Sequence, residues 1–236
     1  MKTLMIAASA VLCAAVTFGL ESANIVGYQT KTIEAGFSLS TPTFLDVGQN
    51  TIDLQNFKLS ENAAGDGTEV IQFLDEKGAC TKVWIWLNAN AGMEDGWYDN
   101  DTWESIENTV FPAVGYLMNV SADVTMMVAG QVKADKTTVT LPAGFSVYGN
   151  NNPSDIDLQS IKLSESAAGD GTEVIQLLDE KGACTKVWIW LNANAGMEEG
   201  WYDNDTWEPI EYTVKAGEAF LMNVTAPVKM TIPSVL

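Results

Sequence analysis

Carboxylates are the residues of this chain best suited to chemistry. Six of them fall within 14 residues between Glu94 and Glu107, and a matching set lies 104 residues further on. The candidate metal ligands in the two sets are Asp95, Asp99, Asp101, Glu199, Asp203 and Asp205. Hard oxygen ligands suit Ca²⁺, so two weak calcium sites are one hypothesis. The spacing lacks the pattern and glycine of an EF-hand loop, so a solvated acidic loop is the competing expectation.

Two carboxylates also suffice for glycoside hydrolysis, without His or Arg. That reaction needs one protonated carboxyl group beside an ionised partner. Nothing in the spacing singles out such a pair, and small β-domains offer little cleft for a substrate. We therefore expect a protein that is not an enzyme.

Tryptophans accompany the acidic loops. On a strand at 80–87, alternation places Ile85 and Leu87 on one face and Trp84 and Trp86, beside Lys82, on the other. Lys is rarely buried without a partner, so the indole face is expected to be wet. It would then be a platform for neutral sugar rings, unless the indoles simply pack beneath the following loop. The candidate ligand-binding residues are Trp84, Trp86, Trp97, Trp103, Trp188, Trp190, Trp201 and Trp207.

The overall composition excludes several function classes. The chain has 31 acidic residues against 12 basic ones, a formal net charge of −19, no His and no Arg. Nucleic acids and anionic glycans need a cationic surface that this chain lacks. Ser-His and Cys-His catalysis and zinc sites containing His are also excluded. No cofactor is indicated apart from the possible calcium ions.

The first 23 residues have the pattern of a secretory signal peptide. Lys2 precedes a stretch of apolar or small residues from Leu4 to Leu20, and Glu21, Ser22 and Ala23 follow. We expect cleavage near Ala23, with Gly19 as the alternative, and export to the periplasm, the cell surface or the medium. No later stretch is long and apolar enough to predict a membrane span.

Two cysteines, Cys80 and Cys184, follow the predicted signal peptide at equivalent positions. One cysteine per copy is not a disulfide framework, so two buried small side chains are expected. A bridge between copies or between molecules is the alternative. It would require Cα atoms within about 7 Å.

A near-exact internal repeat organises the chain. Residues 60–104 and 164–208 differ at only three of 45 positions, which are Asn62/Ser166, Phe73/Leu177 and Asp95/Glu199. The segments that follow match at 11 of 24 positions. We place two tandem domains at 24–130 and 131–236, each large enough for its own core. The near-identity indicates either recent local recopying or a surface held constant by function.

Strand signals dominate each unit, and no long helical periodicity occurs. Strands are expected at 24–33 and 37–40, a hairpin at 68–74 and 80–87, and a second hairpin at 116–120 and 124–128. A short helical turn is expected within 52–59. Short strands with regular turn signals predict an all-β chain of two duplicated β-sandwich or small β-barrel domains.

Several short stretches resemble a loosely defined group of exported β-rich proteins from Lentisphaerae and related bacteria. They are the stretch 24–31 (NIVGYQTK), the stretch 67–74 (GTEVIQFL), the Gly96-Trp97 pair and the stretch 217–224 (GEAFLMNV). The resemblance implies an exported bacterial all-β protein and carries no established activity.

Two functional hypotheses follow from the sequence. The first is a non-catalytic envelope or extracellular protein that acts through contacts with other envelope proteins or with copies of itself. The second is a tandem carbohydrate-binding module for neutral polysaccharides, with the paired tryptophans as platforms. In either case two copies of one surface would add avidity to weak single-site binding.

Overall fold

The computed structural model describes residues 26–235. They form an all-β fold with four short 3₁₀ turns, and no α-helix occurs in this range. None of these helical turns has the length and apolar character needed to cross a bilayer. The predicted signal peptide lies outside the described residues.

The elements of the two repeats correspond one to one. The first repeat contains β1 (Val26–Ile33), β2 (Gly36–Ser40), β3 (Ile52–Asp53), η1 (Leu54–Asn56), β4 (Lys58–Leu59), β5 (Asp66–Leu74), β6 (Cys80–Leu87), η2 (Ala89–Ala91), β7 (Gly96–Asp99), β8 (Thr109–Val110), β9 (Tyr116–Val120) and β10 (Val124–Gln131). The second contains β11 (Thr137–Leu141), β12 (Gly144–Gly149), β13 (Ile156–Asp157), η3 (Leu158–Ser160), β14 (Lys162–Leu163), β15 (Asp170–Leu178), β16 (Cys184–Leu191), η4 (Ala193–Ala195), β17 (Gly200–Asp203), β18 (Thr213–Val214), β19 (Ala219–Val224) and β20 (Val228–Ile232).

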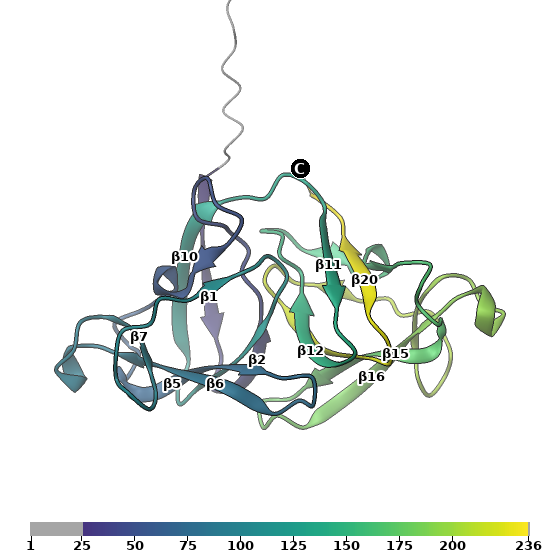
Figure 1. The fold of residues 1–236 in the computed structure, drawn as a ribbon. Helices are drawn as coiled ribbons and strands as arrows, with labels where there is room; N and C mark the ends of the chain where they lie inside the picture. Colours follow the sequence, from purple (N-terminus) through teal and green to yellow (C-terminus); the bar gives the residue numbers. More distant parts are fainter. Residues whose placement is uncertain (1–25, 236) are drawn as a thin grey trace, which may run out of the picture.

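Each repeat contains the same three antiparallel sheets. The five-stranded sheets have the orders β2-β9-β5-β6-β7 and β12-β19-β15-β16-β17. The three-stranded sheets have the orders β1-β10-β4 and β11-β20-β14, and two-stranded ribbons β3-β8 and β13-β18 complete each set. Figure 1 shows the five-stranded sheets side by side along one edge of the molecule, with the three-stranded sheets rising from them.

The first predicted hairpin is confirmed, since β5 pairs with β6 and Ile71 lies opposite Trp84. The second hairpin is wrong. β9 pairs with β2 and β5, whereas β10 pairs with β1 and β4. The chain turns a corner between the two sheets at residues 121–123, so both strands bury alternate residues in one core without pairing. The predicted helical turn is confirmed as η1.

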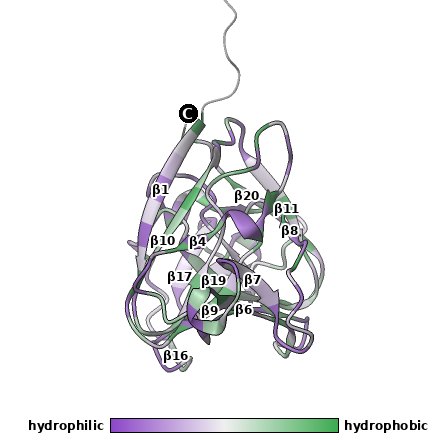
Figure 2. Cartoon of the chain, turned by 90° about the vertical axis from the view of Figure 1, so that its left-hand side faces the viewer, coloured by the Kyte–Doolittle hydropathy of each residue, from purple (hydrophilic) through white to green (hydrophobic). Residues whose placement is uncertain are grey.

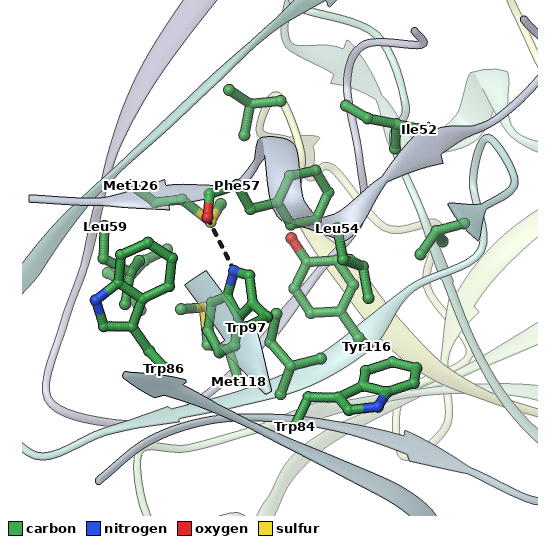
Figure 3. Close-up of a cluster of buried hydrophobic side chains, with 14 of the residues drawn as sticks. Ile52, Leu54, Phe57, Leu59, Trp84, Trp86, Trp97, Tyr116, Met118 and Met126 are labelled. Carbon is green, nitrogen blue, oxygen red and sulfur yellow. Dashed lines mark hydrogen bonds between the residues drawn. The ribbon is translucent and has the colours of Figure 1, made fainter. Parts of the chain in front are cut away.

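Two apolar cores lie between the three- and five-stranded sheets, one mostly in each repeat, although Ala113 of the first repeat belongs to the second core. The core of the first repeat includes Trp86, Trp97, Phe57 and Met118, which are fully or almost fully buried (Figure 3). Parts of β10 are coloured hydrophobic in Figure 2, whereas the outer strand β1 is mostly pale or hydrophilic along its length. Burial of large aromatic and aliphatic side chains is the main favourable contribution to folding.

The two repeats contact each other through a pseudo-symmetric interface. The Phe37 amide donates to the Glu180 carbonyl at 2.9 Å, and the equivalent Phe145 amide donates to the Glu76 carbonyl at 2.8 Å. Leu39 and Val147, at equivalent positions of β2 and β12, share a small apolar cluster. The same surface of each repeat therefore meets its counterpart, as in the isologous interface of a twofold dimer.

Candidate functional site

Six of the eight candidate tryptophans are buried. Trp84 and Trp86 lie in the core of the first repeat together with Trp97, which packs edge-to-face on Trp86 with ring centroids 5.4 Å apart (Figure 3). The indole N–H of Trp97 donates to the Phe57 carbonyl at 2.8 Å. The equivalent residues of the second repeat are buried in the same way, namely Trp188, Trp190 and Trp201.

The open, paired indole platform on β6 and β16 is therefore not formed, and the alternative, in which these indoles pack inside the protein, is confirmed. Both faces of these strands are covered. Trp84 and Trp86 face the main core, and Ile85 and Leu87 pack with Tyr98 in a small outer cluster beneath the loop that contains η2. Alternation identified the two faces correctly, but it could not show that a loop covers the aliphatic one.

Trp103 and Trp207 are the two candidate tryptophans that the structure leaves exposed, at 52% and 51% of their surface. Their backbone φ angles are 59° and 60°, in the left-handed region. A bulky residue seldom adopts this conformation, because its Cβ approaches the following carbonyl oxygen. Backbone strain of this kind concentrates at functional positions, and here it recurs at the same position of both repeats.

A short capped turn holds each exposed indole. One carboxylate oxygen of Asp99 accepts hydrogen bonds from the backbone amides of Asp101 and Thr102, both at 2.9 Å. The Trp103 amide donates to the Asp99 carbonyl at 2.9 Å. These bonds stabilise the ionised carboxylate and lower the pKa of Asp99, with the bond from Thr102 as the largest cause. Asp203 occupies the same role in the second repeat, and its pKa is lowered in the same way.

The predicted calcium ligands do not converge. Within residues 26–235, no three carboxylate or cysteine side chains are grouped as a metal ion would need. Asp99 and Asp203 use a carboxylate oxygen to cap their own turns. The remaining candidates, Asp95, Asp101, Glu199 and Asp205, are exposed. The solvated acidic loop is the interpretation that fits this geometry.

The cysteines also differ from expectation. Cys80 and Cys184 are exposed and carry free thiols. They are the first residues of β6 and β16, and the residues that follow them on each strand are also exposed. A bridge between two molecules stays a prediction.

The two exposed indoles follow edge strands of different sheets. β7 and β17, which lead into the two turns, are the outermost strands of their sheets, whereas β2 and β12 meet at the interface between the repeats. Figure 1 shows β7 at one end of the molecule and the second repeat extending to the other. Each repeat therefore presents one copy of the turn, on a strand that is not part of the contact between the repeats.

A second candidate site is a cleft between the repeats, which we call the wide cleft. Its volume is about 610 Å³, and it lies between β1, β2 and the β15–β16 hairpin. Lys31, Tyr212 and Glu218 bring polar groups to its wall. Sequence reasoning missed this site, because its residues come from distant segments. One signal was available, since Leu177 in its lining is among the three differences within the repeated block.

No protein-family model, curated protein or solved structure matches this chain. The resemblance to exported bacterial β-rich proteins stays a prediction. The residues themselves provide two leads: the duplicated indole turns, and the wide cleft between the repeats.

Proposed function

We propose that this chain is a non-catalytic exported protein of the cell envelope or extracellular space that binds partner proteins through two copies of one indole-bearing turn. The observation that carries the proposal is the exposure of Trp103 and Trp207 in a strained backbone conformation. Tryptophan contributes strongly to protein interfaces because it buries a large area with few rotatable bonds.

The chemistry around each indole indicates the partner. Asp101 and Glu104 flank Trp103 and are exposed, and Asp205 and Glu208 flank Trp207. Like-charged partners would be repelled by this acidic rim, so a basic surface with an apolar pocket is the complement. Because each repeat presents one turn on an edge strand of its own sheet, one molecule would bridge two such surfaces.

Binding to envelope fragments of the producing cells tests this proposal. We expect Trp103→Ala or Trp207→Ala alone to remove the avidity of two-site attachment, which is worth about 10² or more in apparent affinity. The double variant should lose retention. Tyr28→Ala is the matched control, because Tyr28 is exposed but lies outside the turns.

Retention of the double variant at the wild-type level would contradict the proposal. Association with further copies of the chain is the alternative form of the same idea. A concentration series by light scattering separates the two, since envelope binding by a strictly monomeric protein requires another partner.

We further propose that the repeats are tandem β-sandwich-like domains. The support is that each repeat has separate sheets and a mostly separate core. Expression of residues 24–130 alone tests this point. We expect this fragment to unfold in a cooperative thermal transition. Absence of such a transition would show that the two repeats fold only together.

A further inference from the structure

The two repeats are nearly symmetric in backbone, but the clefts on either side of their interface differ. The wide cleft has a volume of about 610 Å³. Its symmetry counterpart, the narrow cleft beside Phe73, Phe145 and Tyr148, has about 280 Å³. Duplication produced two equivalent places, and only one of them holds enough space for a small ligand.

The side chains that line the two clefts differ at equivalent positions. In the narrow cleft, Phe73 packs against Trp84 with ring centroids 4.8 Å apart. In the wide cleft the equivalent residue is Leu177, and Tyr212 packs against Trp188 at 4.8 Å instead. The core indole is covered in both repeats, but in the second repeat the cover comes from a residue that carries a hydroxyl group.

The polar groups of the wide cleft form two hydrogen-bonded groups. Tyr212 donates its hydroxyl hydrogen to the Glu218 carboxylate, and Lys31 Nζ donates to Ser40 Oγ at 3.0 Å and to the Gly217 carbonyl at 3.2 Å. Burial lowers the pKa of Lys31, and the nearby Glu218 charge partly opposes this effect. The Ser38 and Ser146 Oγ atoms, at equivalent positions of the two clefts, are both buried without a hydrogen-bond partner among the described residues, so they do not distinguish the clefts.

The charge of the cleft argues against an ionic ligand. Three lysines and four acidic residues line it, which gives a formal charge of −1 in a chain of net charge −19. Donors and acceptors are mixed along its wall, and Phe37 adds an aromatic side chain. Hydroxyl groups both donate and accept hydrogen bonds, and the apolar faces of sugar rings pack on aromatic side chains.

We propose that the wide cleft binds a neutral oligosaccharide, at one site per chain. Lys31 donates to ligand hydroxyl groups, and Glu218 accepts from them. This site is independent of the indole turns proposed above to contact proteins.

Isothermal titration of the purified protein with neutral trisaccharides of glucose, mannose and N-acetylglucosamine tests the proposal. Trigalacturonate and a glucosamine trimer serve as anionic and cationic comparators. We expect at least one neutral trisaccharide to bind with one-to-one stoichiometry and more tightly than either charged comparator. Absence of binding by all three neutral probes, or tighter binding of a charged one, overturns the proposal.

Reciprocal variants locate the site. Leu177→Phe installs the side chain of the narrow cleft and should weaken binding about tenfold or more, whereas Phe73→Leu on the other side should leave it unchanged. Tyr212→Phe removes one hydroxyl group and keeps the ring. It tests the polar groups of the cleft even if Leu177→Phe fails to fold. Its expected loss is about fivefold to tenfold.

Unchanged affinity in both cleft variants would place any binding elsewhere and overturn the proposal. The double variant Trp103→Ala with Trp207→Ala should bind the trisaccharide as the wild type does. That control distinguishes failure of the cleft proposal from failure of the indole proposal, because each is measured with a separate ligand.

Discussion

Trp103 and Trp207 combine two properties that are individually uncommon, because each is a bulky side chain in the left-handed region and about half exposed. Neither property stabilises the fold. A conformation of this kind costs about 1–3 kcal/mol, and an exposed indole regains little of that cost by burial. Selection for stability alone would favour glycine at both positions.

Replacement of Trp103 by glycine and by alanine measures the strain directly. We expect Trp103→Gly to be more stable than Trp103→Ala by about 1 kcal/mol, because glycine adopts a positive φ without steric cost. Chemical denaturation reports the difference. At Tyr28, in the extended strand β1, the alanine variant should be more stable than the glycine variant. The same order of stability at both positions would show that the Trp103 backbone is not strained.

The acidic caps of the turns predict a pH dependence. The pKa values of Asp99 and Asp203 lie below the ordinary 3.8 in the folded protein. The stability that these two carboxylates contribute is therefore fully present above pH 3.8. It is lost as the pH falls through their lowered pKa values in the folded protein. The amide resonances of Thr102 and Thr206, followed by NMR from about pH 5 to about pH 2, should move with this titration. In Asp99→Asn the Thr102 movement should disappear, and persistence would assign it to another group.

At the scale of elements, the contact between the repeats depends on backbone packing. A Cβ atom on Gly36 would lie 2.4 Å from the Glu180 carbonyl oxygen, and one on Gly144 would lie 2.2 Å from that of Glu76. Their φ angles are 101° and 96°, where side chains are rarely tolerated. The edges of β2 and β12 can approach the opposite hairpin this closely only because both positions are glycine.

Gly36→Ala should therefore destabilise the protein by about 2 kcal/mol or more, through strain and a clash with backbone. Gly92→Ala is the matched control, since Gly92 has a φ of 73° and no atom within 4 Å of an added Cβ. It should cost only about 1 kcal/mol. Equal losses of stability in Gly36→Ala and Gly92→Ala, measured by thermal denaturation, would mean that the close contact at Gly36 contributes nothing to stability.

Much of the element pattern could be predicted from the sequence, while the pairing could not. The β5–β6 hairpin was identified because its turn is short and local. The corner between β9 and β10 has the same local signals, and only the positions of β1, β2 and β4 show that the two strands belong to different sheets. The burial of Trp84 and Trp86 was one of two interpretations of the sequence, and alternation could not decide between them, since it defines two faces of a strand without showing what covers each.

The wide cleft could not be predicted at all, because Lys31, Leu177 and Glu218 are separated by long stretches of chain. The indole turns were partly predicted, as Trp103 and Trp207 were among the candidates. What distinguishes them from the other six tryptophans is exposure and backbone conformation, and neither property is visible in a sequence.

At the scale of the whole molecule, charge repulsion opposes folding. The chain has a net charge of −19. Among residues 26–235 only two ion pairs form, Lys162–Glu199 and Lys215–Asp155, and both are largely exposed. Exposed ion pairs contribute little to the free energy of unfolding. Added salt should therefore weaken the repulsion among the many acidic side chains far more than the attraction within the two ion pairs.

We therefore expect the melting temperature to rise when the sodium chloride concentration increases from about 0.01 M to about 0.5 M. The expected rise is about 2–4 °C or more, which corresponds to a gain of about 1 kcal/mol in the free energy of unfolding for a chain of this size. Differential scanning calorimetry measures the shift. Sucrose at equal osmolality controls for exclusion effects. A melting temperature that falls with salt would show that specific ion pairs outweigh the general repulsion.

The isologous contact between the repeats has a consequence for how this molecule can change. In a dimer of two identical chains, every substitution appears on both sides of the axis, so the two clefts beside it must remain alike. Joining the copies in one chain removes that constraint. Phe73 can fill one cleft while Leu177 leaves the other open, and the remaining symmetric contacts still hold the halves together. The fusion therefore allows one half of a pair to acquire a task that the other half does not share.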